Sequence, residues 1–187
     1  MDIVVILFLT SGLFLGWSLG ANDAANVFGT AVGTRMVRFT TAALVCSIFV
    51  ILGAVFSGAG AANTLGTLGS VNALAGSFVA ALSAAVTVYL MTRLGLPVST
   101  SQAIVGAIIG WNLFSGSITD SNTLFKILGT WVACPLLAGV IAAPLYKITQ
   151  RVLGWAQFHL LRLDAYTRAA LIFAGAFGSY SLGANNI

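Results

Sequence analysis

The amino-acid sequence predicts an all-α integral membrane protein, and three observations carry that prediction. Apolar residues make up 59% of the 187 residues, and the mean hydropathy is +1.02. Only 6% of the residues are charged, against about 25% in average soluble domains. The apolar residues also fall into long runs, and a transmembrane helix needs roughly 20 of them. The length therefore leaves room for about six or seven membrane spans.

The same composition excludes several classes of protein. A soluble domain could not cover its surface with so few charges, because apolar side chains would face water in large patches. The net charge of +4 is too small for a nucleic-acid-binding surface. Cys46 and Cys134 lie in apolar runs without a CxxC motif, and His159 has no companion ligands, so we expect no structural metal site. No nucleophile–base pair is evident, so we expect no enzyme.

The first apolar run begins at Ile3 and leads directly into a polar segment. No basic residue precedes it, so we interpret it as a membrane span and not as a signal peptide. The segment GANDAANVFGT follows from Gly20, with Asn22, Asp23 and Asn26 as its polar side chains. Glycine weakens a helix, and asparagine and aspartate favour helix starts. We therefore expect the helix to unwind near Gly20 and to restart near Asp23.

Further apolar runs predict further membrane helices. They cover residues 39–56, 73–91, 94–114, 124–146 and 169–182. An uncharged loop, residues 57–72, follows the first of these runs. Residues 73–114 leave one side of the membrane and return to it, either as two spans or as a hairpin that enters partway. Residues 147–168 mix basic and apolar side chains, which predicts an amphipathic helix in the headgroup region with Trp155 as its anchor.

The basic residues predict the orientation in the membrane. Arg35 and Arg38 lie together, and four of the other basic residues lie within residues 147–168. The positive-inside rule places both segments in the cytoplasm. The uncharged loop at 57–72 and the polar loop at 115–122 then lie outside, as does the N-terminus.

An internal repeat relates the beginning of the chain to its end. The sequence SLGAN at residues 18–22 recurs at residues 181–185. With the orientation above, the first copy runs from outside to inside and the second runs the other way. Inverted repeats with broken helices that meet near the midplane are typical of secondary transporters. We therefore divide the chain into a first inverted repeat, residues 1–163, and the start of a second, residues 164–187.

The polar segment of the first run predicts a cation site. Asp23 is the one acidic residue at membrane depth, where a carboxylate is costly unless it is paired or faces water. Its carboxylate and the carbonyls freed by a helix break would form an oxygen-lined site suited to Na⁺ or H⁺.

The segment PVSTSQ, residues 97–102, predicts an anion site at the start of a helix. Pro97 disfavours a helix that continues through the preceding residue, and Ser99 and Gln102 have the spacing of a capping box. Helix N-termini bind phosphate and similar anions through free N–H groups. The hydroxyls of Ser99, Thr100 and Ser101 add further donors.

The charges near these motifs favour coupled transport of two ions. Apart from Arg93, we expect no Lys or Arg near them. An anion held beside Asp23 would be repelled, and a cation bound at Asp23 would remove that repulsion. The pattern therefore favours anion–cation symport over a simple anion pore.

Three segments resemble the signatures of the inorganic phosphate transporter (PiT) family: GANDAANVFGT, PVSTSQAIVGAIIGWN and SLGANNI. The resemblance extends over the whole chain. It implies two inverted repeats, sodium- or proton-coupled phosphate uptake through the plasma membrane, a homodimer, and no cofactor besides the co-transported ion. It also implies a second half with another PVST-like hairpin, which we expect to follow Ile187.

The resemblance also implies the site residues, and chemistry suggests how they divide between the two ions. Hydroxyls and a helix N-terminus suit phosphate, and a carboxylate with neighbouring amides suits sodium. The predicted phosphate ligands are Asn22, Ser99, Thr100, Ser101, Gln102 and Asn185. The predicted sodium ligands are Asp23, Asn26, Asn186 and Ser99.

The sequence leaves other functions open. Within the family, a proton-coupled phosphate permease or a sulfate permease fits the same tetrahedral oxyanion chemistry. Outside it, a non-transporting, truncated membrane subunit would also fit. A channel is less favoured, because no ring of charges or filter-like carbonyl motif is evident.

Overall fold

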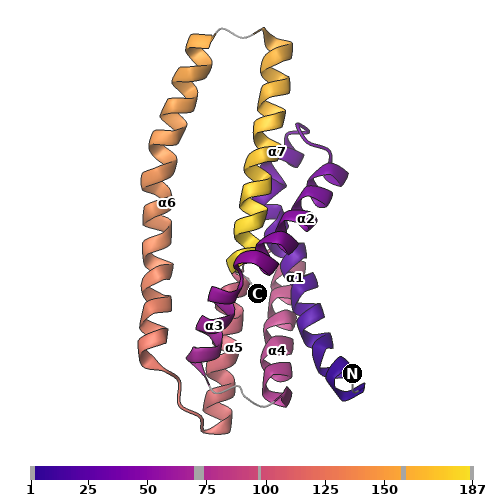
Figure 1. The fold of residues 1–187 in the computed structure, drawn as a ribbon, viewed down its shortest axis with the longest axis vertical. Helices are drawn as coiled ribbons and strands as arrows, with labels where there is room; N and C mark the ends of the chain where they lie inside the picture. Colours follow the sequence, from indigo (N-terminus) through magenta and orange to yellow (C-terminus); the bar gives the residue numbers. More distant parts are fainter. Residues whose placement is uncertain (1–2, 70–73, 97, 157–158, 186–187) are drawn as a thin grey trace.

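The computed structural model describes residues 3–69, 74–96, 98–156 and 159–185, and within them the fold is all-α without a strand. The described part forms seven helices (Figure 1): α1 Ile3–Gly33, α2 Phe39–Ser57, α3 Ala59–Leu68, α4 Leu74–Arg93, α5 Thr100–Ser115, α6 Ser121–Ala156 and α7 Leu160–Asn185. This confirms the predicted fold class of an all-α membrane protein. The proposed division into residues 1–163 and 164–187 stays a prediction.

Four of the described helices are long and apolar enough to cross a membrane: Val5–Gly33, Phe39–Ser57, Leu74–Arg93 and Ser121–Trp155. That is fewer than the six or seven for which the length leaves room. With 10 and 16 residues, α3 and α5 fall short of the roughly 20 residues that a span needs. Three charged side chains, Arg162, Asp164 and Arg168, lie in the first turns of α7.

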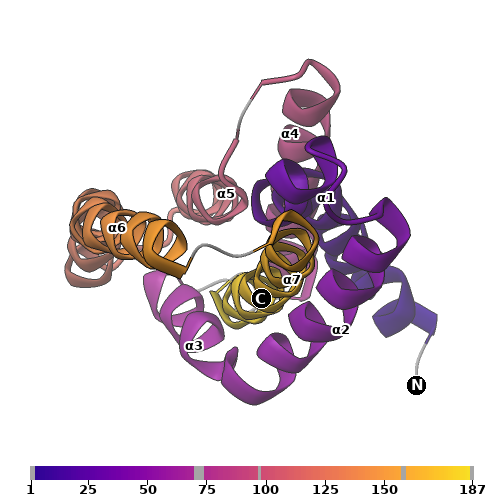
Figure 2. The ribbon, with the colours of Figure 1, turned by 90° about the horizontal axis from the view of Figure 1, so that it is seen from above.

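The helices are arranged around α7, with α6 at the edge. Figure 2 shows α7 surrounded by α1, α2, α3 and α5. Only the first part of α6 packs against the rest, where Ile127 and Trp131 contact a cluster that includes Leu68 and Val105. None of the most apolar stretch of α6 is buried. In a bilayer this apolar surface can face lipid without the cost that water would impose.

The two copies of SLGAN run in opposite directions, as the repeat predicts. In Figure 1, α1 runs upward and α7 runs downward. The segment at 34–38 lies toward the upper end of the molecule, where α6 ends and α7 begins. At the lower end, the N–H of Asp120 donates to the carbonyl of Leu68 at 3.0 Å. The ends of the two loops assigned to the outside therefore lie together.

The polar segment of α1 does not interrupt the helix, so the predicted break near Gly20 is wrong. α1 is continuous for 31 residues. The reason is tertiary, because the amide of Asn22 donates to the carboxylate of Asp23 and to the carbonyl of Val98. These contacts satisfy the buried polar groups without opening the backbone hydrogen bonds of the helix.

Two further local predictions are wrong. The expected loop at 57–72 contains α3, where the hydroxyl of Thr64 donates to the carbonyl of Gly60. The expected interfacial helix at 147–168 does not exist as a separate element, because α6 continues to Ala156 and α7 begins at Leu160. A separate helix would add two more ends with unsatisfied backbone groups, and extending the long helices avoids them.

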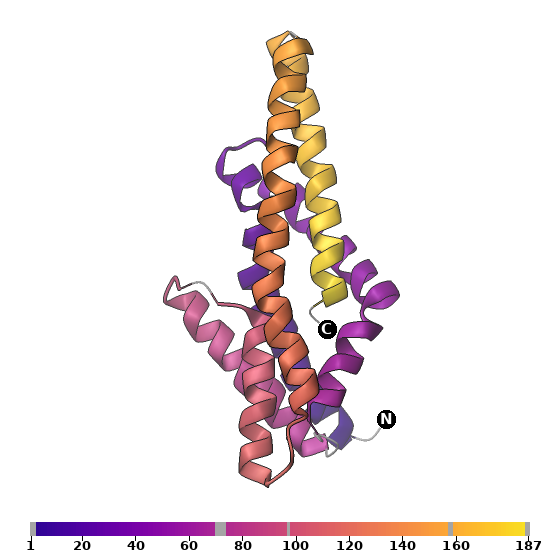
Figure 3. The ribbon, with the colours of Figure 1, turned by 90° about the vertical axis from the view of Figure 1, so that its left-hand side faces the viewer.

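Residues 74–115 form a hairpin that turns back inside the depth of α1. The carbonyl of Val98, in the turn between α4 and α5, accepts a hydrogen bond from Asn22 at 2.8 Å. Asn22 lies eleven residues before Gly33, roughly 16 Å below the end of α1. Figure 3 shows the same turn near mid-height. The turn between α4 and α5 therefore lies beside the middle part of α1 and not at its end.

Asp120 caps α6, and we expect its removal to destabilise the protein in a pH-dependent way. The hydroxyl and the N–H of Thr123 both donate to the carboxylate of Asp120, the hydroxyl having the larger effect. These hydrogen bonds favour the ionised form and hold the pKa of Asp120 below its ordinary value of 3.8. Because the pKa of Asp120 is lower in the folded state than in the unfolded state, its ionised carboxylate stabilises the fold at pH values above the unfolded-state pKa. This stabilisation is lost as the pH falls through the folded-state pKa. Asp120→Ala should therefore lower the thermal midpoint in detergent at pH 7, and less so at pH 3.

The control for this prediction is Asp120→Asn, since asparagine caps helices about as well as aspartate. It should retain most of the midpoint at pH 7. A deficit of Asp120→Ala that stays equal at pH 7 and pH 3 would contradict the role of the ionised carboxylate.

Candidate functional site

Asp23 lies where α1 meets the hairpin, and its carboxylate is buried, with 8% of the residue exposed. The amide of Asn22 donates to one carboxylate oxygen at 2.6 Å, and the hydroxyl of Thr100 donates to the other at 3.1 Å. The hydroxyl of Thr92 lies 3.4 Å from the side-chain oxygen of Asn22. Motifs that are 77 residues apart in the sequence therefore form one polar cluster.

Ser99 begins α5, as its spacing from Gln102 predicts. Its backbone is extended, and its hydroxyl accepts the N–H of Gln102 at 3.4 Å. The first N–H groups of a helix have no partner within the helix and can bind an anion. The side chain of Gln102 is exposed, and only its backbone takes part in the cap. Pro97 lies outside the described residues.

A cavity of about 460 Å³ lies beside Asp23 and joins three parts of the fold. α1, the hairpin and α7 all contribute, so the second copy of the repeat reaches the same place as the first. Six predicted site residues line it: Asp23, Asn26, Ser99, Thr100, Ser101 and Asn185. Asn22 is bonded to this cluster, and Asn186 lies outside the described residues. Ser181 also lines the cavity and was not predicted, although its place in the repeat is a signal for it.

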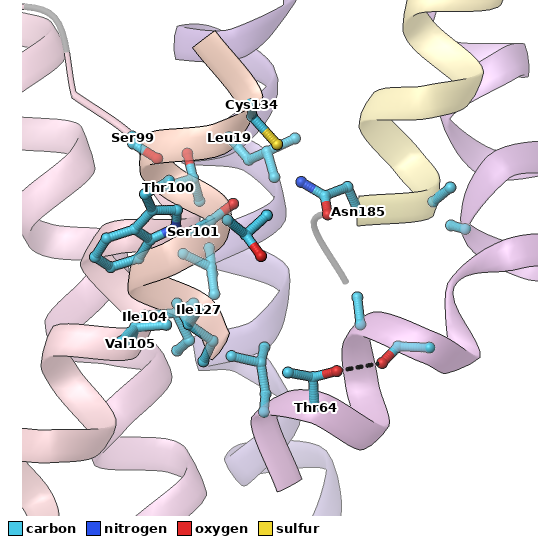
Figure 4. Close-up of a pocket in the computed structure, with 18 of the residues that line it drawn as sticks. Leu19, Thr64, Ser99, Thr100, Ser101, Ile104, Val105, Ile127, Cys134 and Asn185 are labelled. Carbon is cyan, nitrogen blue, oxygen red and sulfur yellow. Dashed lines mark hydrogen bonds between the residues drawn. The ribbon is translucent and has the colours of Figure 1, made fainter. Parts of the chain in front are cut away.

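A larger cavity, of about 1070 Å³, shares Ser99, Thr100, Ser101 and Asn185 with the first. Figure 4 shows the three hydroxyl residues on one side of it and Asn185 of α7 on the other. Leu19 of α1, Thr64 of α3 and Cys134 of α6 also line it. The serine–threonine turn at the start of α5 therefore borders both cavities.

Lys126 of α6 lines the larger cavity, so the expectation that only Arg93 lies near the motifs is wrong. Arg93 itself lines neither cavity, and its guanidinium lies over the ring of Tyr89 at 5.6 Å. Lys126 lies in an otherwise apolar run, 25 residues after Ser101, and only packing of α6 against α3 and α5 brings it close.

The arrangement provides two kinds of ligand close together. A buried carboxylate with neighbouring amide and hydroxyl oxygens can hold a hard monovalent cation. The hydroxyls and N–H groups at the start of α5 can donate to an oxyanion. No group of three or more His, Cys, Asp or Glu side chains that could hold a metal ion occurs among the described residues.

Comparison with known proteins gives one family. Residues 19–177 match the profile of the phosphate transporter family. A "Putative phosphate permease" of Pyrococcus horikoshii is 31% identical over 161 residues, which cover 81% of this chain and 40% of that protein. Proteins described in the same words occur in Chlamydia pneumoniae, 31% identical over 79% of this chain and 37% of that one, and in Mycobacterium tuberculosis, 31% identical over 80% and 30%. No solved structure matches significantly. The chain spans two fifths or less of the length of these relatives.

Proposed function

The chain belongs to the phosphate transporter family, and we propose that it carries inorganic phosphate across a membrane, coupled to a sodium gradient. The family is one of transporters, and the four apolar helices make the chain an integral membrane protein. We place it in the plasma membrane, as a homodimer. The observation that carries the proposal is the buried Asp23 carboxylate, held by Asn22 and Thr100 at the edge of a cavity that the second copy of SLGAN also lines.

The charge of Asp23 supports coupling of two ions. Two like unit charges about 4 Å apart repel each other by about 4 kcal/mol at an effective dielectric constant of about 20. A phosphate at the hydroxyls of Ser99–Ser101 would therefore bind weakly while Asp23 stays unpaired. A sodium ion at Asp23 cancels that repulsion, so each ion favours the binding of the other.

The two cavities suggest where each ion binds. The smaller one contains the carboxylate and the amide of Asn26, which suits sodium. The serine–threonine turn, bordering both cavities, suits phosphate, with Asn185 facing it from α7. The cavities support Ser99, Thr100, Ser101 and Asn185 for phosphate, and Asp23, Asn26 and Ser99 for sodium. Asn22 and Gln102 stay in the proposal for phosphate, and Asn186 stays in the proposal for sodium, on the sequence resemblance alone.

Uptake of radiolabelled phosphate into proteoliposomes tests the proposal, with the protein expressed from its complete coding sequence. We expect uptake that depends on an inward sodium gradient and that excess sulfate does not inhibit. Uptake driven by a proton gradient alone would replace sodium by protons as the coupling ion. Inhibition by sulfate at concentrations similar to phosphate would favour a sulfate permease, and absence of any uptake would contradict the proposed function.

A further inference from the structure

The larger cavity contains one formal charge among the described residues that line it. Its wall consists of apolar, glycine, hydroxyl and amide side chains, apart from Lys126. The hydroxyls of Ser99, Thr100 and Ser101 border the same cavity. An exposed ammonium group and the serine hydroxyls therefore face one space, and both kinds of group donate hydrogen bonds to oxyanions, whereas the hydroxyl of Thr100 already donates to Asp23.

The ammonium group of Lys126 is available to an incoming anion. The one ion pair within 4 Å among the described residues joins Arg168 to Asp164 at the far end of the fold. The nearest acidic residue along the chain is Asp120, whose charge attracts Lys126 without forming an ion pair within 4 Å. Its carboxylate accepts hydrogen bonds from the N–H and the hydroxyl of Thr123. Lys126 is exposed, so it can move toward a ligand without first breaking a salt bridge.

The position of Lys126 along α6 places its charge near the cavity's outer end. It is the sixth residue of the helix, roughly 8 Å from the start at Ser121. That end carries the loop assigned to the outside of the membrane. Asp23, in contrast, lines the other cavity. The two charges therefore line different cavities that share the serine–threonine turn, so the attraction for an anion and the attraction for a cation arise in different cavities.

We propose that Lys126 draws the phosphate anion from the outer side of the membrane into the larger cavity and toward Ser99–Ser101. This inference rests on the proposed function and adds a residue to it. A single cation in a low-dielectric cavity raises the local concentration of an anion and its rate of entry, and salt weakens the effect. Lys126 therefore affects the apparent affinity for external phosphate more than the maximal rate.

Lys126→Gln tests this in sodium-driven phosphate uptake into proteoliposomes. We expect KM for phosphate to rise about three- to ten-fold at low ionic strength, with a smaller change in the maximal rate. Choline chloride added on both sides should shrink the difference from the wild type. Lys126→Arg keeps the charge and should stay close to the wild-type KM. The double variant Lys126→Gln/Thr130→Lys moves the charge one turn along the same cavity wall and should recover part of the affinity.

Lys147→Gln is the matched control, because Lys147 is an exposed lysine on the same helix that lines neither cavity. It should leave KM unchanged. The inference is wrong if Lys126→Gln changes KM no more than Lys147→Gln does, or if Lys126→Arg behaves like Lys126→Gln. In either case, sodium-driven phosphate uptake by the wild type would still support the proposed function. If the wild type shows no uptake, the proposed function fails first.

A lipid headgroup offers the same phosphate chemistry as the free anion, and a lysine near the bilayer surface can bind it. The assay distinguishes the two sources when it is repeated in liposomes with and without anionic lipid. A KM effect of Lys126→Gln that persists in both supports recruitment of free phosphate. An effect that appears only with anionic lipid would overturn the inference and assign Lys126 to the membrane surface.

Discussion

Asp23→Asn is expected to lower sodium-driven phosphate uptake by at least about 30-fold. The side chain keeps its size and most of its hydrogen-bonding capacity, but it loses the negative charge that would hold the cation. Removing one charge from a buried, hydrogen-bonded pair of opposite charges costs about 2–5 kcal/mol, and each 1.4 kcal/mol is a factor of ten. Initial rates in proteoliposomes, with and without a sodium gradient, measure the effect.

Asp164→Asn provides the matched control for this variant. Asp164 is an exposed partner of Arg168 at 3.0 Å, and exposed ion pairs contribute little to stability. Its replacement removes the same charge far from both cavities and should leave uptake unchanged. Asp23→Asn protein that still shows full sodium-dependent uptake would contradict the assignment of Asp23 to the cation.

Gly183→Ala is expected to give the largest loss of stability, because α2 and α7 cross there in backbone contact. A Cβ at Gly183 would lie 2.0 Å from the carbonyl oxygen of Val50. Across the same crossing, a Cβ at Gly53 would lie 2.0 Å from the carbonyl oxygen of Tyr180. A backbone atom cannot move aside as a side chain can, so the helices must separate. We expect a cost of about 3 kcal/mol, at the upper end for overpacked sites.

The variant should also impair transport. α7 carries Ser181 and Asn185 into the cavity beside Asp23, and the hydroxyl of Ser57 hydrogen-bonds that of Tyr180 at 2.6 Å across the same crossing. Separation of the two helices would shift these side chains away from the hairpin. Thermal unfolding in detergent measures the loss of stability, and the uptake assay measures the loss of transport.

Gly20→Ala is the control, because Gly20 is the same residue in the first copy of SLGAN. A Cβ there meets nothing within 4 Å, and alanine is favoured over glycine inside a helix by about 1 kcal/mol. This variant should be as stable as the wild type or more so. Equal destabilisation by Gly20→Ala and Gly183→Ala would show that the crossing of α2 and α7 is not the cause.

Much of the candidate site could be predicted from local sequence. Asp23 stands out because a carboxylate in an apolar run needs a partner, and the capping pattern by itself marks Ser99 as a helix start. The structure brings both to one cavity. Lys126 could not be assigned this way. It lies in an apolar run, and the sequence does not show which side of α6 borders a cavity. The continuity of α1 was likewise not predictable, since the hairpin supplies the partners of Asn22.

By itself, the sequence determined the all-α membrane fold, the opposite directions of the two SLGAN copies and the polar residues available for a site. These properties depend on composition, on the length of the apolar runs and on the placement of charges, all of which can be read along the sequence. Only the tertiary structure decided the depth of the hairpin and the different roles of two identical glycines. Gly20 faces open space among the described residues, while Gly183 packs against α2. The physical reason is that packing depends on which helix lies opposite, and five identical residues carry no information about their neighbours.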